Sequence, residues 1–279
     1  MKTGRELPVA VGVTDHEFSV LEYAAAEAER LGADLRLVHA YTVPPNALGS
    51  PYGYDIPAAF RLDGQDILRQ AKSHVRTHGG PGHVKCVLSR GVPPNVLERE
   101  SKTARLMVIG QDPIKPWYFR LYEGRSAHHL AEYSHCPVVI VPRDWHEVQG
   151  REQIVAFVDG PQSARAILTF AFDAAVTRDA PVKIVHVAAE DPYDYERWHS
   201  TKDVVEEWAE TYRDVPVTMV VDHGSRQHVA MVAAQDAALL VLGQPHTVQP
   251  IRLASHSLAR AVIARAACPV AVVPVQHRE

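Results

Sequence analysis

Short runs of apolar residues alternate along the chain with longer segments in which apolar residues recur every three or four positions. The first run lies in Val9–Ser19. An amphipathic segment follows over Ser19–Arg30, where the spacing predicts a helix with Asp15 near its N-cap and Gly32 after its end. Strands that are apolar at every position are typical of parallel sheets, because helices cover both faces of such a sheet. The pattern therefore predicts βαβ units around a buried parallel sheet.

The same order of apolar runs occurs twice, at about the same spacing. The matching segments are Val9–Ser19 with Ile154–Ser163, Leu35–Ala40 with Val182–Val187, Leu106–Gln111 with Leu239–Gln244, and Cys136–Pro142 with Cys268–Pro274. Such self-similarity indicates two copies of one unit. It predicts two tandem doubly wound α/β domains, each with a five-stranded parallel sheet, over residues 1–144 and 153–279 with a polar linker at 145–152.

One segment in each copy departs from this pattern. Tyr41–Pro57 and Glu190–Ser200 are rich in proline and tyrosine, and each follows the second predicted strand of its copy. We expect both to be loops over the strand ends, where open α/β sheets bind ligands. A surface insertion without a function explains the same composition equally well.

Composition excludes several classes of partner. The 279 residues are 46% hydrophobic and 22% charged with a formal net charge of −4, so the chain has no basic field that would attract nucleic acid. No apolar run reaches the roughly 18 residues that a membrane helix needs, and the first residues show no signal-peptide pattern. Three cysteines do not indicate a disulfide framework. We expect a cytoplasmic protein.

Taken together, these segments resemble the universal stress protein family in its tandem, two-domain form. The resemblance covers nearly the whole chain, and its most specific parts are the Val-Asp-Gly-Pro-Gln-Ser stretch that ends at Ser163 and the Cys-Pro-Val runs that begin at Cys136 and Cys268. It implies a five-stranded parallel α/β sandwich like that of the adenine-nucleotide alpha hydrolases. It also implies a non-catalytic binding or signalling role in the stress response, with a signalling partner that the sequence does not name.

The resemblance also implies how the two copies assemble. Many members dimerise through the last strand, so Val138–Val141 would pair with Val270–Val273 at an internal pseudo-twofold axis. An apolar edge strand that is left unpaired promotes aggregation, which independently favours this pairing. Tandem relatives often dimerise again, and a homodimer is therefore the expected higher assembly.

Members of the family that bind ATP carry an acidic residue after the first strand and a loop of the pattern Gly-x2-Gly-x9-Gly followed by Ser or Thr. Glycines allow backbone N–H groups to converge on phosphate oxygens, and a helix N-terminus adds a favourable dipole. The second copy keeps Asp159, Gly243 and Ser257 at this spacing, but His246 and His256 stand at the second and third glycine positions.

The resemblance assigns a role to each matching position of the second copy. The expected ligand is ATP or AMP with Mg²⁺. Asp159 would contact the ribose or the metal, the backbone at His186 and Val187 the adenine, and Gly243 with Ser257 the phosphates.

The first copy matches this loop less well. Its corresponding positions are Thr14 for the acid, Val38, His39 and Ala40 for the adenine, and Gly110 and Gly124 for the phosphates, with Arg125 in the hydroxyl position and Ser126 after it. Pro113 stands at the second glycine, where it removes a backbone donor. A side chain in a glycine-only conformation costs about 1–3 kcal/mol, so we expect both loops to follow another path.

The replacements also allow two other interpretations of the loops. Protonated His246 and His256, or Arg120 and Arg125, can hold an anion through side chains, or they simply line a polar surface. The aromatic cluster at Trp117–Phe119 either stacks on an adenine or packs against a neighbouring helix or partner. A binding-incompetent scaffold and a weak Mg²⁺-dependent nucleotide hydrolase are the alternative functions.

Other candidate chemistry is sparse. His74 and His78 share a helical face, as metal ligands do, but the sequence shows no third ligand and favours an exposed helix end. His128–His129 are adjacent and therefore do not share a face. All three cysteines, Cys86 included, are expected to be small buried residues of strands. No hydrolase or protease motif occurs, which favours a protein that is not an enzyme.

Overall fold

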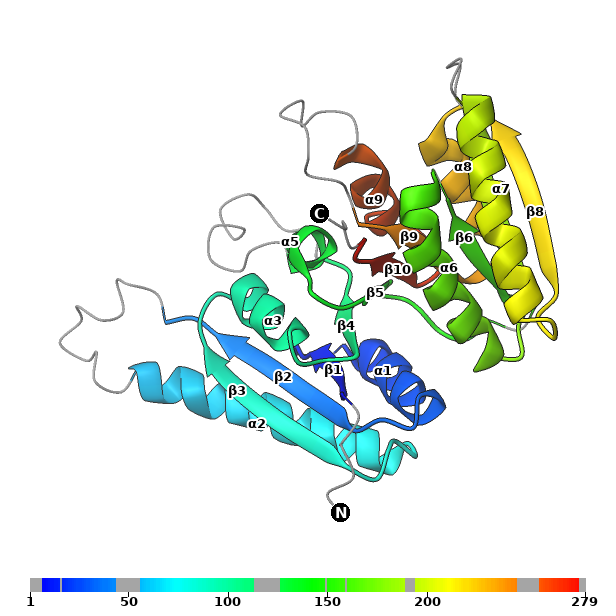
Figure 1. The fold of residues 1–279 in the computed structure, drawn as a ribbon. Helices are drawn as coiled ribbons and strands as arrows, with labels where there is room; N and C mark the ends of the chain where they lie inside the picture. The colour runs from blue at the N-terminus through cyan, green and yellow to red at the C-terminus, as the bar shows by residue number, and fades with distance from the viewer. Residues whose placement is uncertain are drawn as a thin grey trace. The chain divides into compact units, whose positions relative to one another are not determined.

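The chain divides into two compact units, Met1–Asp144 and Trp145–Glu279, in a computed structural model (Figure 1). The structure describes residues 7–15, 17–43, 56–112, 126–148, 150–158, 160–188, 194–244 and 256–275. Among the helices of these ranges, none combines the length and the apolar character that crossing a bilayer requires.

Strands and helices alternate along each unit. The first unit contains β1 (Val9–Gly12), α1 (Phe18–Arg30), β2 (Leu35–Tyr41), α2 (Ile56–Thr77), β3 (Val84–Arg90), α3 (Pro93–Ser101), β4 (Leu106–Gly110), α5 (Ser126–Tyr133) and β5 (Val138–Val141). The second unit contains β6 (Gln153–Phe157), α6 (Pro161–Val176), β7 (Val182–Ala188), α7 (Asp194–Thr211), β8 (Val217–His223), α8 (Arg226–Ala233), β9 (Ala237–Gly243), α9 (His256–Ile263) and β10 (Val270–Val273).

The two units have the same sheet topology. The strand order is β3-β2-β1-β4-β5 in the first unit and β8-β7-β6-β9-β10 in the second, and the strand pairs within each unit are parallel. Val9 of the central strand β1 pairs with Leu35 on one side and with Leu106 on the other. The tandem doubly wound fold that the sequence predicts is confirmed.

Helices cover both faces of each sheet. In the first unit α1 packs beside α2, while α3 packs beside α5; in the second unit the pairs are α6 with α7 and α8 with α9 (Figure 1). The central strands are consequently sealed, and Val9, Ala10 and Val11 of β1 are fully buried. This two-sided burial explains why the strands read as continuous apolar runs in the sequence.

Two local predictions are wrong. Asp194–Ser200, expected to lie in a loop, form the start of helix α7, because the residues after Pro192 continue into a long amphipathic segment in which Val204 and Val205 are buried. Asp15 is not the N-cap of α1, since this helix begins at Phe18 and Glu17 stands at the N-cap position without a capping side-chain hydrogen bond.

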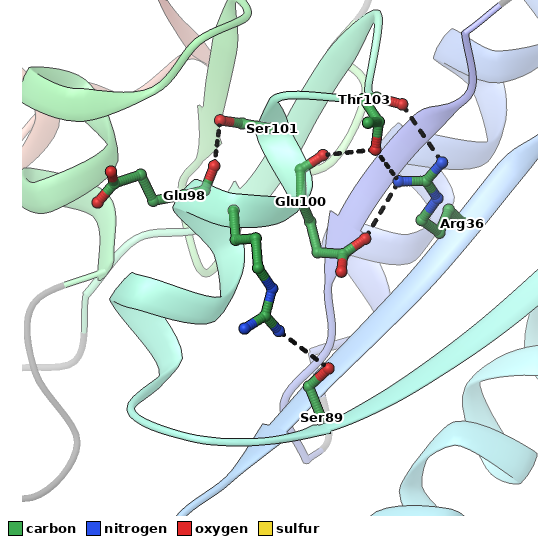
Figure 2. Close-up of polar contacts among 7 residues, drawn as sticks. Arg36, Ser89, Glu98, Glu100, Ser101 and Thr103 are labelled. Atoms are coloured by element: carbon green, nitrogen blue, oxygen red, sulfur yellow. Dashed lines mark hydrogen bonds and ion pairs between the residues drawn. The ribbon is translucent and has the colours of Figure 1, made fainter.

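A polar network fastens helix α3 to strand β2 in the first unit (Figure 2). The Arg36 guanidinium donates to Glu100 Oε2 at 3.1 Å, to Thr103 Oγ1 at 2.9 Å and to the Thr103 carbonyl at 3.3 Å. The side chains of Arg36 and Glu100 are only 15% and 16% exposed. Because the charges are partly shielded from water and several hydrogen bonds share one guanidinium, we infer that this network stabilises more than an ordinary surface ion pair.

Candidate functional site

Ligands of doubly wound sheets bind at the carboxyl ends of the strands where the strand order reverses. That point lies between β1 and β4 in the first unit and between β6 and β9 in the second. Gly110 ends β4 and Gly243 ends β9, and Thr14 follows β1 closely. The topology therefore brings together residues that the sequence analysis assigned to one site.

An acidic side chain that the sequence analysis did not single out fills this point in the first unit. Thr14 Oγ1 donates to Glu17 Oε2 at 2.5 Å. A Cβ added to Gly110 would stand only 2.7 Å from the same oxygen. Arg143 Nη2 lies 3.9 Å from the other oxygen, Oε1. The Glu17 carboxylate thus lies against the first glycine of the loop in which a phosphate was expected.

A second carboxylate occupies the N-terminus of helix α5. Asp112 accepts hydrogen bonds from the backbone N–H groups of Ala127 at 3.1 Å and of His128 at 3.4 Å. The His128 ring Nδ1 is also 2.8 Å from Asp112 Oδ2, and both of these side chains are about 15% exposed. Free N–H groups at a helix N-terminus attract anions, and here the chain itself supplies the anion.

The second unit differs at both positions. A Cβ on Gly243 would meet Ile167 Cδ1 at 3.2 Å and Ser163 Cβ at 3.6 Å, which are carbon atoms and carry no charge. Gln111 and Gln244 make equivalent hydrogen bonds to the last residue of their neighbouring strand, so Pro245 occupies the sequence position of Asp112. Proline has no side-chain acceptor with which to cap the helix that follows.

Two histidines at the predicted adenine positions form hydrogen bonds with backbone carbonyl groups of the protein. His39 Nδ1 lies 2.9 Å from the Val13 carbonyl, and His186 Nδ1 lies 3.0 Å from the Val158 carbonyl. A carbonyl oxygen only accepts, so each Nδ1 carries the proton and donates it. The buried His186 ring also stacks on Trp198, with centroids 4.8 Å apart. The sequence analysis assigned only backbone roles here and did not anticipate these side-chain contacts.

The remaining predicted positions divide into two groups. Val38 and Val187 are buried in β2 and β7, and Ala40 is half-buried near the end of β2. Ser126 is the first residue of α5, His256 is the first residue of α9, and Ser257 follows it; the placement of the last two side chains is not described. Asp159, His246, Gly124 and Arg125 lie outside the described residues, as do Pro113, Trp117–Phe119 and Arg120. Contact of any of these residues with a nucleotide stays a prediction.

The other candidate residues have clear structural partners. His128 contacts Asp112, whereas the His129 Nε2 lies 2.7 Å from Glu98 Oε2 of α3, so the adjacent histidines point to different partners. Cys136 and Cys268 are buried as predicted, and burial raises the pKa of their thiols to about 11 and about 12. The prediction for Cys86 is wrong. It is exposed because β3 is an outer strand of its sheet.

Comparison with known proteins identifies the duplicated unit. The sequence model of the Universal stress protein family matches residues 7–142 and 150–274, which together span most of the chain. The chain belongs to the universal stress protein family. It is 28% identical over 265 residues to the universal stress protein Rv2623 of Mycobacterium tuberculosis, covering 85% of this chain and 86% of that protein.

Further similarities agree with this assignment. The universal stress protein Rv3134c, also of M. tuberculosis, is 27% identical over 215 residues, which are 75% of this chain and 77% of that protein. Among solved structures, a universal stress protein from Archaeoglobus fulgidus superimposes with a TM-score of 0.72 at 16% identity and covers 97% of each chain. At that identity the structural likeness supports the fold, and the family assignment rests on the sequence matches.

Proposed function

We propose that this universal stress protein is a non-catalytic stress-response protein of the cytoplasm that binds one adenine nucleotide, ATP or AMP, in its second unit and none in its first. The observation that carries this proposal is the difference between the two strand switch points. Glu17 and Asp112 place carboxylates at both phosphate positions of the first unit. In the second unit, carbon atoms of Ile167, Val275 and Ser163 lie nearest to Gly243, and Pro245 stands at the sequence position of Asp112.

Electrostatics favours exclusion of phosphate from the first unit. Two like charges about 4 Å apart repel by roughly 4 kcal/mol at the effective dielectric constant near a protein surface. The attraction of an anion to a helix N-terminus is typically about 0.3–1 kcal/mol. The α5 N–H groups of Ala127 and His128 are in addition already bonded to Asp112. Arg143 beside Glu17 offsets part of this repulsion. We infer that the remaining repulsion still outweighs the attraction, since two of the N–H groups at this helix end already serve Asp112.

In the second unit the proposed ligand contacts follow the family pattern. Gly243 would allow the phosphates to approach the backbone, and Ser257 would donate its hydroxyl to them. Asp159 would hold the ribose or a Mg²⁺ ion. His186 fixes the ends of β6 and β7 by its bond to Val158, so it would shape the adenine pocket while its backbone makes the contact.

Calorimetric titration with ATP and AMP, with and without Mg²⁺, tests the proposal. We expect one nucleotide per chain. Ser257→Ala should weaken binding about tenfold or more, because a hydrogen bond to a charged group contributes roughly 1.5–3 kcal/mol. As a control, Ser126→Ala removes the serine that follows the corresponding position of the first unit, and it should leave the affinity unchanged. Two nucleotides per chain would contradict exclusion from the first unit.

A nucleotide-free scaffold is the second candidate, and the histidines at positions 246 and 256 favour it because each replaces a glycine of the family loop. Absence of any heat of binding, together with no nucleotide released on denaturation, would select this function. A third outcome, slow hydrolysis, is tested by phosphate release with Mg²⁺. Release that disappears in Asp159→Ala would make the protein an enzyme and would overturn the non-catalytic role.

A further inference from the structure

Helices α1 and α2 of the first unit bring together three side chains of the kind that bind transition metals. Glu22 projects from α1, and His74 and His78 project from α2. One ligand atom of each residue lies within 4.8 Å of those of the other two. We propose that these residues form a binding site for a divalent transition-metal ion of the Zn²⁺ class. This site is separate from the strand switch point and does not depend on nucleotide binding.

The histidine pair has the spacing that a shared ion needs. Residues four apart on a helix are neighbours on one face, so both imidazoles can reach a common point. The rings of His74 and His78 stack with centroids 4.0 Å apart and an interplanar angle of 24°. Phe18 stacks against His74 at 4.4 Å. Because the nitrogen lone pairs lie in the ring planes, nearly parallel stacked rings do not point at one ion, and binding requires the two imidazoles to turn out of this stack.

One hydrogen bond favours the tautomer of His78 that metal binding requires. His78 Nδ1 lies 2.9 Å from the His74 carbonyl oxygen, which can only accept, so Nδ1 carries the proton. In the neutral ring, Nε2 then has a free lone pair. Metal-binding histidines commonly use their other nitrogen in this way, to donate to a backbone carbonyl. The His78 ring is therefore held in the tautomer that offers Nε2 to an ion.

The third ligand comes from the neighbouring helix. Glu22 Oε1 lies 3.0 Å from His74 Nε2. The His74 side chain is 15% exposed and the Glu22 side chain is 49% exposed, so the site opens to solvent on the carboxylate side. These residues line one surface pocket together with Glu29. The pocket gives an ion access from solvent and leaves room for water at its remaining coordination positions.

The ligand set indicates the class of ion. The two imidazole nitrogens are borderline donors that suit Zn²⁺, Co²⁺, Ni²⁺ and Cu²⁺, whereas the carboxylate oxygen is a harder donor. Two His with one Glu is a known zinc set with an open position. Ca²⁺ and Mg²⁺ prefer sets made of oxygens and waters. We therefore expect selectivity for the transition metals. Bound metal would link α1 to α2 and raise the thermal stability of the first unit.

Titration of the EDTA-treated, dialysed full chain with Co²⁺ tests the site, because visible absorption reports the coordination directly; competition with Zn²⁺ then gives its affinity. We expect one strong site per chain. His74→Ala and His78→Ala should each weaken binding at least tenfold, and Glu22→Gln should weaken it less, because an amide oxygen is a poorer ligand. Exposed His228 of α8 provides the matched control. His228→Ala should bind as the wild type does.

Thermal unfolding of the same proteins with and without Zn²⁺ gives a second measurement. Zinc should raise the melting temperature of the wild type and of His228→Ala but not that of His74→Ala. Circular dichroism of the metal-free variants establishes that they fold. Equal Co²⁺ affinity in all the variants, or no spectral change in the wild type, would overturn the proposal and would leave the His74–Glu22 contact as a helix-to-helix hydrogen bond alone.

Discussion

The Glu17 carboxylate lies against Gly110, with Oε2 only 2.7 Å from the place that a Cβ of Gly110 would take. Any other residue at position 110 would have to displace this side chain. In the family pattern a glycine here lets a phosphate approach the backbone. In this chain the same glycine makes room for the protein's own acid. A glycine that matches the family motif therefore has a different use here from the one that the motif suggests.

Removing the two internal charges should open the first unit to anions. In Glu17→Gln/Asp112→Asn both side chains keep their size but lose their charge, so the repulsion of about 4 kcal/mol per close pair disappears. We expect phosphate or ATP binding at the first unit to strengthen at least tenfold, measured by calorimetry in a Ser257→Ala background. Glu152→Gln, which removes one exposed charge, is the control. Equal affinity in all the proteins would contradict exclusion by these carboxylates.

Loss of Arg36 should destabilise the first unit. Arg36→Ala removes hydrogen bonds to Glu100 and Thr103 and leaves a partly buried carboxylate without its cation. Hydrogen bonds to charged groups contribute about 1.5–3 kcal/mol, so we expect the free energy of unfolding to fall by about 2 kcal/mol in urea denaturation. Lys202→Ala breaks an exposed pair with Glu206 and should cost under about 0.5 kcal/mol. An equal decrease in the free energy of unfolding for Arg36→Ala and Lys202→Ala would contradict the inference that the Arg36 network stabilises more than a surface ion pair.

The three cysteines should differ sharply in reactivity. Cys86 is exposed, whereas Cys136 and Cys268 are buried with thiol pKa values raised to about 11 and about 12 by burial. The thiolate is the reactive form. At pH 8, iodoacetamide should modify Cys86 in the native protein and all three residues in denaturant, as read by peptide mass spectrometry. Fast native labelling of Cys136 would show that its unit opens readily.

The same raised pKa values predict lower stability at alkaline pH. A thiol whose pKa is higher in the folded than in the unfolded state stabilises the fold below its unfolded value, which is 9.0 here, and the stabilisation is lost as pH rises towards 11 and 12. We expect the free energy of unfolding to decrease between pH 9 and pH 11. Cys136→Ser should reduce this slope, whereas Cys86→Ser at an exposed site should change it less.

The centre of the second unit depends on Phe172, a fully buried aromatic residue of α6 whose ring stacks on Tyr212 at 5.0 Å. Phe172→Ala should lower the free energy of unfolding by about 3–5 kcal/mol, because it leaves a cavity in a sealed core. Phe60 of α2 is 36% exposed. Phe60→Ala should therefore cost much less. If Phe172→Ala lowers the free energy of unfolding as little as Phe60→Ala does in urea denaturation, the core has collapsed around the smaller side chain.

The architecture was predictable because its signal is local and repeated. Runs such as Val138–Val141 are apolar throughout, which predicts strands of a buried parallel sheet. Their recurrence at Val270–Val273 predicts two copies of one unit. The sequence predicts a loop up to Ser200, because proline and tyrosine are frequent there, whereas helix α7 already begins at Asp194. Propensity is a weak guide where tertiary packing sets a helix end.

The candidate site was less predictable because it depends on side-chain directions in space. Glu17 follows the motif position Thr14 by three residues and Asp112 precedes the motif position Pro113. Nothing in the sequence shows that their side chains turn towards Gly110 and the α5 terminus. Glu22 is 52 residues from His74 along the chain. The missing third metal ligand could be found only after α1 and α2 were seen to pack together.

Joining two copies in one chain has a genetic consequence. In a homodimer every substitution appears in both subunits, so a change that closes one pocket closes the other as well. Here each copy has its own codons, and Asp112 can face a helix end in the first unit while Pro245 occupies the matching sequence position in the second. Covalent duplication therefore allows the two copies to diverge independently at matching positions, as Asp112 and Pro245 have done.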